Sequence, residues 1–498
     1  MYQKVRRLPD TESVERKSEM NSFVNAVRNQ EARTENGMKA RLSTSSACVD
    51  LFFKIGASRG KDIVPQFTAA YVENRDYAMR IAQWARDVRQ GSGERKLFHD
   101  IVNHLINRDS DAAIALIRKA PELGRWDDVL VAVGTQGEIS DIAVEMIREA
   151  LEKGNGLCAK WMPRKGPLAA NLREKLGWSP KFYRKRLVEL TKVVEQDMCA
   201  NKWDEINFNH VPSVASARYK KAFARHTDKY KEWAAKLVST DPNVRAEVKV
   251  NAAAVYPYDV LKGVIGAYGM RYDKANLDHL TAQWDALPNY VGDASILPVV
   301  DVSGSMMSPA GGYKSKSKTT CLDVSVSLGL YLADKNKGAF KDTFLTFSGS
   351  PRLVNLKGNI IDKIKQISAS EWEMNTNLHA AIQKILDVAV KGKVPAEDMP
   401  KVLLILSDMQ FDQCARYDDS AIQMIKRKYE DAGYTVPQIV FWNLNAADNV
   451  PVKFNAKGVA LVSGFSPSIV KSVLSADLED FTPEQIMLKT IMSERYNY

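Results

Sequence analysis

An aspartate and two serines at alternate positions, Asp301, Ser303 and Ser305, directly follow a run of apolar and β-branched residues at 296–300. Such a run predicts a buried strand that ends in a small polar loop. The spacing allows three side-chain oxygens to converge on one hard cation, and Gly304 allows the backbone to fold closely around it. A serine-rich turn that binds no metal has the same pattern, so the interpretation depends on ligands from later segments.

Two later segments supply such ligands. Thr376 lies in a polar loop that precedes a predicted helix, and Asp408 follows a second predicted buried strand at 402–406. In open α/β sheets, ligands bind at the carboxyl ends of the strands. We therefore predict a site for Mg²⁺, or another divalent cation, formed by Asp301, Ser303, Ser305, Thr376 and Asp408. Only two of these ligands are charged, which leaves a position for water or for an acidic group of a protein partner.

The elements that position these residues alternate between strands and helices. The pattern predicts further strands at 339–348, 436–444 and 458–462, helices at 319–334 and 378–390, and a terminal helix capped by Thr482. This alternation predicts a doubly wound, Rossmann-like parallel sheet. A loop rich in glycine, lysine and serine, 311–318, is placed to close over the cation site.

The chain ahead of this region is helical in pattern almost throughout. Successive short amphipathic segments between about residues 47 and 290 favour a solenoid of stacked, HEAT-like helix pairs, although no clean repeat of fixed period is present. A globular helical bundle is the alternative. We place the boundaries at 1–40 for a polar arm, 41–290 for the helical domain, 291–475 for the α/β domain and 476–498 for a C-terminal helix.

The positive charge of the chain is concentrated in one block. The net charge is +10, and residues 151–250 contain 21 Lys and Arg against 11 Asp and Glu, so the rest of the chain is balanced. Aromatic residues such as Trp161, Trp178 and Phe182 are interleaved with the cations, which is the combination that captures single-stranded RNA. A solvated helix surface is the alternative. The candidate RNA-binding residues are Lys160, Arg164, Lys165, Arg173, Lys175, Lys181, Arg184, Lys185, Arg186, Arg218, Lys220, Lys221 and Arg225. A weaker second patch consists of Arg86, Arg89, Arg95 and Lys96.

Several classes of protein are disfavoured by the sequence. No apolar run approaches the ~20 residues of a membrane helix, and the first 20 residues lack the apolar core of a secretory signal. Five cysteines without a CxxC pair indicate reduced thiols and a cytoplasmic setting. The glycine-rich segment 56–62 departs from a phosphate-binding loop, and no nucleophile elbow is present, so we expect no enzymatic activity.

Several short motifs resemble those of a known family. These are the segments 161–166, 203–208, 211–213, 256–259 and 407–411. They look like motifs of a TROVE-related family of plants, fungi and large phages. The predicted layout, a helical solenoid followed by an α/β domain, resembles the TROVE module of the Ro autoantigen with its von Willebrand factor A domain, and the five predicted cation ligands resemble the metal-ion-dependent adhesion site of such domains. The resemblance implies helical repeats that close into a ring through the A domain and that bind single-stranded ends or small structured RNAs.

Three functions follow as hypotheses. The first is a non-enzymatic, Ro-like RNA-binding protein of a ribonucleoprotein, motivated by the basic block. The second is a metal-dependent protein-interaction scaffold that does not bind RNA, motivated by residues 301–305. The third is a nuclease or nucleotide hydrolase, which has the least support from the residues.

Overall fold

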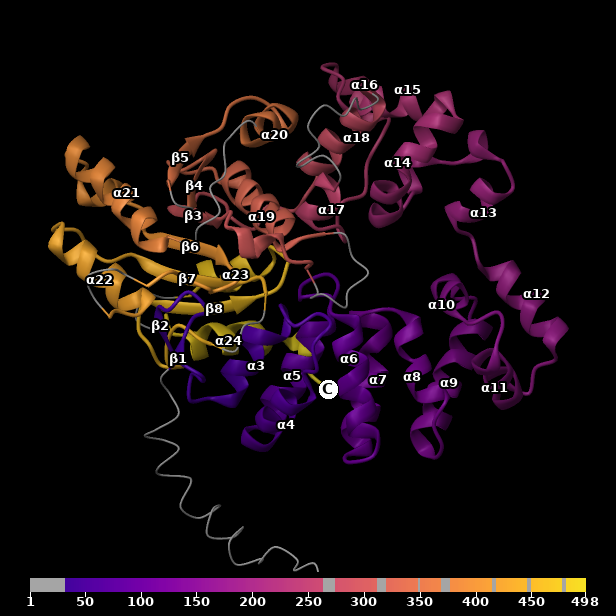
Figure 1. The fold of residues 1–498 in the computed structure, drawn as a ribbon. Helices are drawn as coiled ribbons and strands as arrows, with labels where there is room; N and C mark the ends of the chain where they lie inside the picture. The colour runs from indigo at the N-terminus through magenta and orange to yellow at the C-terminus, as the bar shows by residue number, and fades with distance from the viewer. Residues whose placement is uncertain are drawn as a thin grey trace, which may run out of the picture.

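The computed structural model describes residues 32–262, 274–310, 319–347, 350–368, 377–413, 418–445, 449–476 and 481–498. It consists of a helical region followed by an α/β region, as the sequence predicts. The predicted sheet is parallel throughout, whereas the observed sheet is mixed, because its edge strand runs antiparallel. Figure 1 shows the sheet on one side of the molecule, with the helices extending away beneath it and returning above it.

The sheet has six strands in the order β5-β4-β3-β6-β7-β8. The strands are β3 (Ile296–Asp301), β4 (Thr343–Phe347), β5 (Arg352–Asn355), β6 (Val402–Ser407), β7 (Gln438–Asn443) and β8 (Val459–Ser463). All neighbours are parallel except β4 and β5, and β3 pairs with β6 along its length. The strand order therefore reverses between β3 and β6, which is where open α/β sheets place their ligand sites.

The strand order determines on which face of the sheet the helices of the α/β region lie. They are α19 (Cys321–Lys335), α20 (Ile360–Ser368), α21 (Leu378–Gly392), α22 (Ala421–Asp431), α23 (Ile469–Leu474) and α24 (Pro483–Ile491). Right-handed crossovers place α19 and α22 on opposite faces, because the chain moves in opposite directions from β3 to β4 and from β6 to β7. The edge strand β5 and helices α20 and α22 are not predicted from the sequence.

The first helical block stacks helices in chain order. Its members are α3 (Ala47–Ile55), α4 (Val64–Glu73), α5 (Arg75–Arg86), α6 (Arg95–Ile106), α7 (Ser110–Leu123), α8 (Leu130–Val133), α9 (Glu138–Glu152), α10 (Gly156–Trp161), α11 (Pro167–Leu176) and α12 (Pro180–Leu190). Helices in this block contact those one to three places along the chain, as in an α-solenoid. Ser179 caps α12 and Pro180 occupies its first turn, as the sequence predicts.

A second helical block has its own hydrophobic core. It contains α13 (Val194–Cys199), α14 (Ser213–His226), α15 (Asp228–Leu237), α16 (Pro242–Ala246), α17 (Pro257–Leu261) and α18 (Lys274–Asp285). Phe208, Phe223, Tyr230 and Trp233 pack together in this core, separately from the large core that joins the first block to the sheet. The three residues 191–193 connect the two blocks. We call this junction the seam.

Both ends of the helical region pack on the α/β region. At one end, the amide of Gly56 donates to Ser463 Oγ (3.1 Å), and Ser463 donates to the carbonyl of Phe52 (2.9 Å). At the other end, Trp284 Nε1 on α18 donates to Asp334 Oδ2 on α19 (2.9 Å). The helical path therefore begins and ends on the sheet domain (Figure 1).

The two ends also meet each other at a contact that we call the clasp. Arg59 Nε lies 2.6 Å from Glu94 Oε1, and the Arg59 guanidinium lies 4.3 Å above the Phe465 ring, which packs edge-on against Tyr258 of α17. Gly93 has φ +69°, and a Cβ there would lie 2.5 Å from the Tyr256 hydroxyl. Only glycine fits this close approach.

The segment predicted as a polar arm is partly structured. Strands β1 (Ala32–Arg33) and β2 (Lys39–Ala40) form a hairpin, while residues 1–31 lie outside the described residues. Thr34 Oγ1 donates to the carbonyl of Phe411 (2.6 Å), and Asn36 Nδ2 donates to that of Gln410 (2.8 Å). This hairpin therefore belongs physically to the α/β region, after β6. In the described part of the chain, no helix is both long and apolar enough to cross a membrane.

Candidate functional site

The predicted cation site lies at the point where the strand order reverses. Asp301 ends β3, and Asp408 follows β6 on the neighbouring strand. Asp301 Oδ1 accepts from the amide of Ser303 (2.9 Å), and its Oδ2 accepts from Ser407 Oγ (2.6 Å). Ser303 Oγ and Ser305 Oγ lie 3.1 Å apart, and Ser305 also bonds to Asp408. Four of the five predicted ligands are thus brought together.

The electrostatics of this site favour a positive ion. Asp301 and Asp408 are both buried, and burial raises the pKa of each carboxyl; the Asp408 charge raises the pKa of Asp301 further. Met409, directly after Asp408, has φ +66°, a left-handed conformation that is costly for a non-glycine residue and that clusters at functional sites. Among the described residues, neither carboxylate forms an ion pair with a basic side chain.

The donor set fits a hard divalent cation. Two carboxylates and two hydroxyls are the oxygen ligands that Mg²⁺ takes, and a cation would relieve the repulsion between the two buried acids. Thr376 and the loop 311–318 lie outside the described residues, so their predicted roles stay predictions. No group of three or more His, Cys, Asp and Glu side chains with metal-site geometry occurs in the described ranges.

We expect Mg²⁺ to stabilise the protein through Asp301 and Asp408. At a free Mg²⁺ concentration ten times Kd, selective binding to the folded state adds about 1.4 kcal/mol to the free energy of unfolding. Thermal unfolding with and without MgCl₂, at constant ionic strength, measures this. Asp408→Asn should abolish the increase in Tm, whereas Asp418→Asn, at an exposed site, should retain it. An equal increase in both variants would place the ion elsewhere.

Four cations of the basic block surround one cavity, which we call the cation pocket. Arg164, Arg173, Lys181 and Arg184 line a cavity of about 410 Å³ together with Pro180, Tyr183 and Leu187. Within the described structure, none of the four cations lies within ion-pair distance of a carboxylate. Tyr183 is buried beneath them, and its hydroxyl donates to the carbonyl of Pro163 (2.9 Å). The pocket therefore holds uncompensated positive charge over a fixed floor.

Lys175 and Arg186, two other residues of the predicted RNA surface, bind backbone carbonyls of the protein itself. Lys175 Nζ donates to the carbonyls of Val133 and Thr135 (both 3.0 Å) and to Ser140, near the end of α8. Arg186 Nη2 donates to the carbonyl of Leu151 (2.8 Å) at the end of α9. Both side chains therefore donate hydrogen bonds to backbone carbonyls near helix ends, and we remove them from the candidate RNA surface.

Lys220 is removed for a different reason. Its side chain is 6% exposed and donates to the carbonyl of Val260 (3.2 Å). Burial, together with a smaller contribution from the neighbouring charge of Lys221, lowers the pKa of Lys220 to about 8. A buried cation of this kind is a core residue that cannot reach a phosphate.

The remaining candidates lie on the surface in separate places. Lys165, Arg218, Lys221 and Arg225 are exposed. Lys185 is also exposed, with its Nζ 3.9 Å from Glu189 Oε1, and Lys160 is half-buried beside Trp161.

The basic residues of the weaker patch around residue 91 all have partners within the protein. Arg86 is buried against Asp128, Arg95 pairs with Asp127, Lys96 pairs with Asp100, and Arg89 bonds to the carbonyl of Glu122.

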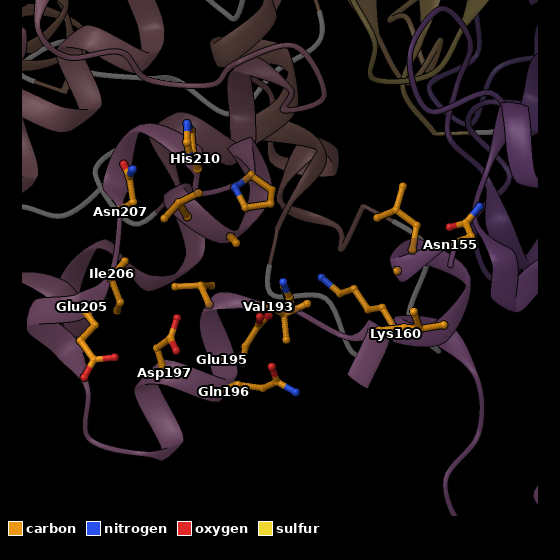
Figure 2. Close-up of a pocket in the computed structure, with 18 residues that line it drawn as sticks. Asn155, Lys160, Val193, Glu195, Gln196, Asp197, Glu205, Ile206, Asn207 and His210 are labelled. Atoms are coloured by element: carbon orange, nitrogen blue, oxygen red, sulfur yellow. The ribbon is translucent and has the colours of Figure 1, made fainter. Parts of the chain in front are cut away.

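A second cavity, of about 710 Å³, occupies the seam; we call it the seam cavity. Figure 2 shows Asn155 and Lys160 entering from one side and Glu205, Ile206 and Asn207 facing them from the other. His210 lies above, and Glu195 and Gln196 lie below. The seam cavity is not predicted from the sequence, because its two walls come from segments about fifty residues apart. The only sequence signal is indirect: residues 191–193 separate two helical segments.

Comparisons with known proteins divide the chain at the same place as the fold. A domain of unknown function, DUF7788, matches residues 295–495, and another, DUF2828, matches residues 34–119 and 169–297. The chain is 28% identical over 515 residues to uncharacterized protein L728 of Acanthamoeba polyphaga mimivirus, covering 92% of this chain and 86% of that protein. The crystal structure of the Deinococcus radiodurans Ro (RSR) protein matches 90% of this chain and 99% of its own, with 14% identity and a TM-score of 0.38. The chain is thus similar over most of its length to a viral protein, with a boundary between the matched domains at the start of β3.

Proposed function

We propose that this protein is a non-enzymatic RNA-binding protein whose main phosphate contact is the cation pocket. The observation that supports this most directly is the convergence of Arg164, Arg173, Lys181 and Arg184 on one cavity without a carboxylate counter-ion in the described structure. Cations that pair with acids on a protein surface have little to gain from a phosphate. None of these four cations forms an ion pair within the described ranges, so each can bind a phosphate and release condensed counter-ions from the RNA.

Aromatic side chains beside the cation pocket make RNA a better ligand than an isolated anion. Phe182 lies on α12 next to Lys181, its side chain is 51% exposed, and its ring packs edge-on against Trp178 at 5.0 Å between centroids. An exposed ring held in place by a second ring is a platform on which an unpaired base stacks.

We infer a cytoplasmic setting for this activity. The cysteines of the described chain are free thiols, as this setting predicts.

Charge reversal in the cation pocket tests this proposal. The double variant Arg164→Glu and Arg184→Glu should bind a fluorescein-labelled 20-nucleotide oligouridine at least tenfold more weakly in 100 mM salt. The slope of log K against log salt should also become shallower by about 1.4, because two phosphate contacts of a single strand are lost. Fluorescence anisotropy measures both quantities.

The matched control changes the same net charge elsewhere. Lys384 and Lys391 are exposed on α21 of the α/β region, and their double replacement by glutamate should leave the affinity within about twofold. A loss as large as that of the pocket variant would mean that only net charge matters. The absence of any oligouridine binding by the wild-type protein would refute the proposal itself.

A second candidate function is metal-dependent capture of an acidic protein partner. The observation that favours it is the pair of buried carboxylates beside Ser303 and Ser305. If these residues hold Mg²⁺, so small a ligand set would leave a coordination position for an external acid. Asp301→Asn separates the two functions, because it should abolish Mg²⁺-dependent partner capture while the oligouridine affinity survives.

A further inference from the structure

The seam cavity and the cation pocket are neighbours along helix α12. Leu187 lines the cation pocket, and Leu190, one turn later on the same helix face, lines the seam cavity. Arg164 of the cation pocket donates from Nη2 to Thr191 Oγ1 (3.0 Å), and Thr191 is flanked by two residues that line the seam cavity. A ligand held by Arg164 therefore lies close to the chain segment that lines the seam cavity on both sides of Thr191.

The walls of the seam cavity suit a flat ring with polar edges. Leu157, Leu190 and Val193 contribute apolar surface, while Asn155, Asn207 and His210 contribute hydrogen-bonding groups. The Leu157 side chain is 66% exposed and therefore offers apolar surface to a ligand in the cavity. The volume of about 710 Å³ lies within the range of cavities that bind small organic groups.

The charges in the seam cavity divide it into two sides. Lys160 enters from the α10 side, whereas Asp197 and Glu205 lie across from it (Figure 2). The charge of Glu205 is partly offset by Lys202, whose Nζ lies 2.9 Å from Glu205 Oε2, so Asp197 contributes most to the acidic side. Phosphates are repelled by the acidic side, but the N–H groups of a nucleobase are attracted to carboxylates. The charge distribution therefore admits the base of a nucleotide and keeps its phosphate on the side of Lys160 and the cation pocket.

Glu195 supplies an acceptor that is still unsatisfied. Tyr219 donates to Glu195 Oε1 (3.2 Å), whereas Glu195 Oε2 is buried and has no hydrogen-bond partner among the described residues. Buried acceptors without a partner are uncommon in folded proteins. Because Oε2 is buried, the carboxylate has to rotate towards the cavity before an N–H donor on a ligand can complete its hydrogen bonding.

We propose that the seam cavity receives an unpaired base from the same RNA strand whose phosphate is bound in the cation pocket. This inference rests on the proposed RNA-binding function and specifies its ligand as a single-stranded nucleotide, with a phosphate group on α12 and a base between the two helical blocks. A base bound there contacts both blocks and ties them together across residues 191–193.

Two labelled strands test the inference. One is a 3′-fluorescein-labelled oligouridine of eight nucleotides, and the other has the same phosphates with abasic sites throughout. The wild-type protein should bind the base-bearing strand about tenfold more tightly than the abasic strand. The double variant Leu157→Ala and His210→Ala, at two exposed side chains, should lose most of that advantage, keep only the part that comes from stacking on Phe182, and bind the abasic strand as the wild type does. Val72→Ala, at an 82% exposed residue on α4, is the control and should change neither affinity.

The outcomes separate this inference from the function on which it rests. Equal wild-type affinity for the two strands, or an unchanged base advantage in the Leu157 and His210 variant, would overturn the base site while leaving phosphate binding intact. An equal loss on both strands would also overturn it, because the cavity would then hold phosphate. If the wild type binds neither strand, RNA binding and the base site fail together. The Arg164 and Arg184 variant should lose affinity for both strands.

Discussion

Replacement of Arg59 with alanine is expected to lower the free energy of unfolding by about 3–5 kcal/mol at neutral pH, because it leaves a buried carboxylate without its partner. Arg59 Nε lies 2.6 Å from Glu94 Oε1, and Glu94 is only 3% exposed. The guanidinium also stacks on Phe465 and bonds to the Tyr258 hydroxyl. The variant therefore weakens the clasp that joins the two ends of the helical region to the α/β region.

The effect of Arg59→Ala should depend on pH. Burial raises the pKa of Glu94 even with Arg59 present, and removal of the arginine raises it further. A carboxyl whose pKa is higher in the folded than in the unfolded state costs stability when the pH rises through the folded pKa. The loss should thus be largest at pH 8 and should shrink as the pH falls towards 5. Chemical unfolding followed by circular dichroism measures it.

A second change provides the control for the clasp. Glu94→Gln removes the charge that Arg59 neutralises, so the double variant Arg59→Ala and Glu94→Gln should recover much of the lost stability. It should also show little change between pH 5 and pH 8. If the double variant is as unstable as Arg59→Ala, the loss comes from the stacking on Phe465 and not from the buried charge.

Replacement of Lys220 with methionine is expected to raise the free energy of unfolding by about 2 kcal/mol at pH 7. Burial lowers the pKa of Lys220 from an ordinary 10.5 to about 8. At about 1.36 kcal/mol per pKa unit, the buried charge costs about 3 kcal/mol, and the lost hydrogen bond to Val260 offsets about 1 kcal/mol of the gain. Methionine fills a similar volume without a charge.

The sign of the pH dependence follows from the depressed pKa. Below pH 8 the folded protein holds a charged lysine in its core, so the advantage of Lys220→Met is fully present there. Between pH 8 and about 10.5 the lysine loses its proton more readily in the folded state, and the advantage should decline. Lys221→Met, at the exposed neighbour, should change stability by less than 0.5 kcal/mol. An unchanged oligouridine affinity in Lys220→Met would support its removal from the RNA surface.

The sheet and the edge that carries the candidate cation site were predictable, because the buried strands can be recognised from short stretches of sequence. The apolar runs at β3 and β6 each end at a polar residue, and parallel strands bring such ends to one edge. Thus Asp301 and Asp408 were correctly paired across about a hundred residues. Strand β5 was missed because it is an exposed edge strand, with polar residues at both ends and no buried face.

The basic block was predictable as a block but not residue by residue. Arg184 and Arg186 lie two residues apart on α12, yet the first lines the cation pocket and the second caps the end of α9. Lys220 and Lys221 are adjacent, but only the second is exposed. A helix turns successive side chains by about 100°, so neighbouring cations face different surroundings, and those surroundings are set by tertiary contacts.

The bond between Ser463 and the carbonyl of Phe52 spans 411 residues of chain. During synthesis on the ribosome, α3 emerges long before β8, and at roughly 5–20 residues per second about 20–80 seconds pass before β8 is available to pack against α3. Contacts this distant along the chain slow folding, because the whole intervening loop must close first. The nascent chain is therefore the form of this protein that is most exposed to aggregation and most dependent on chaperones.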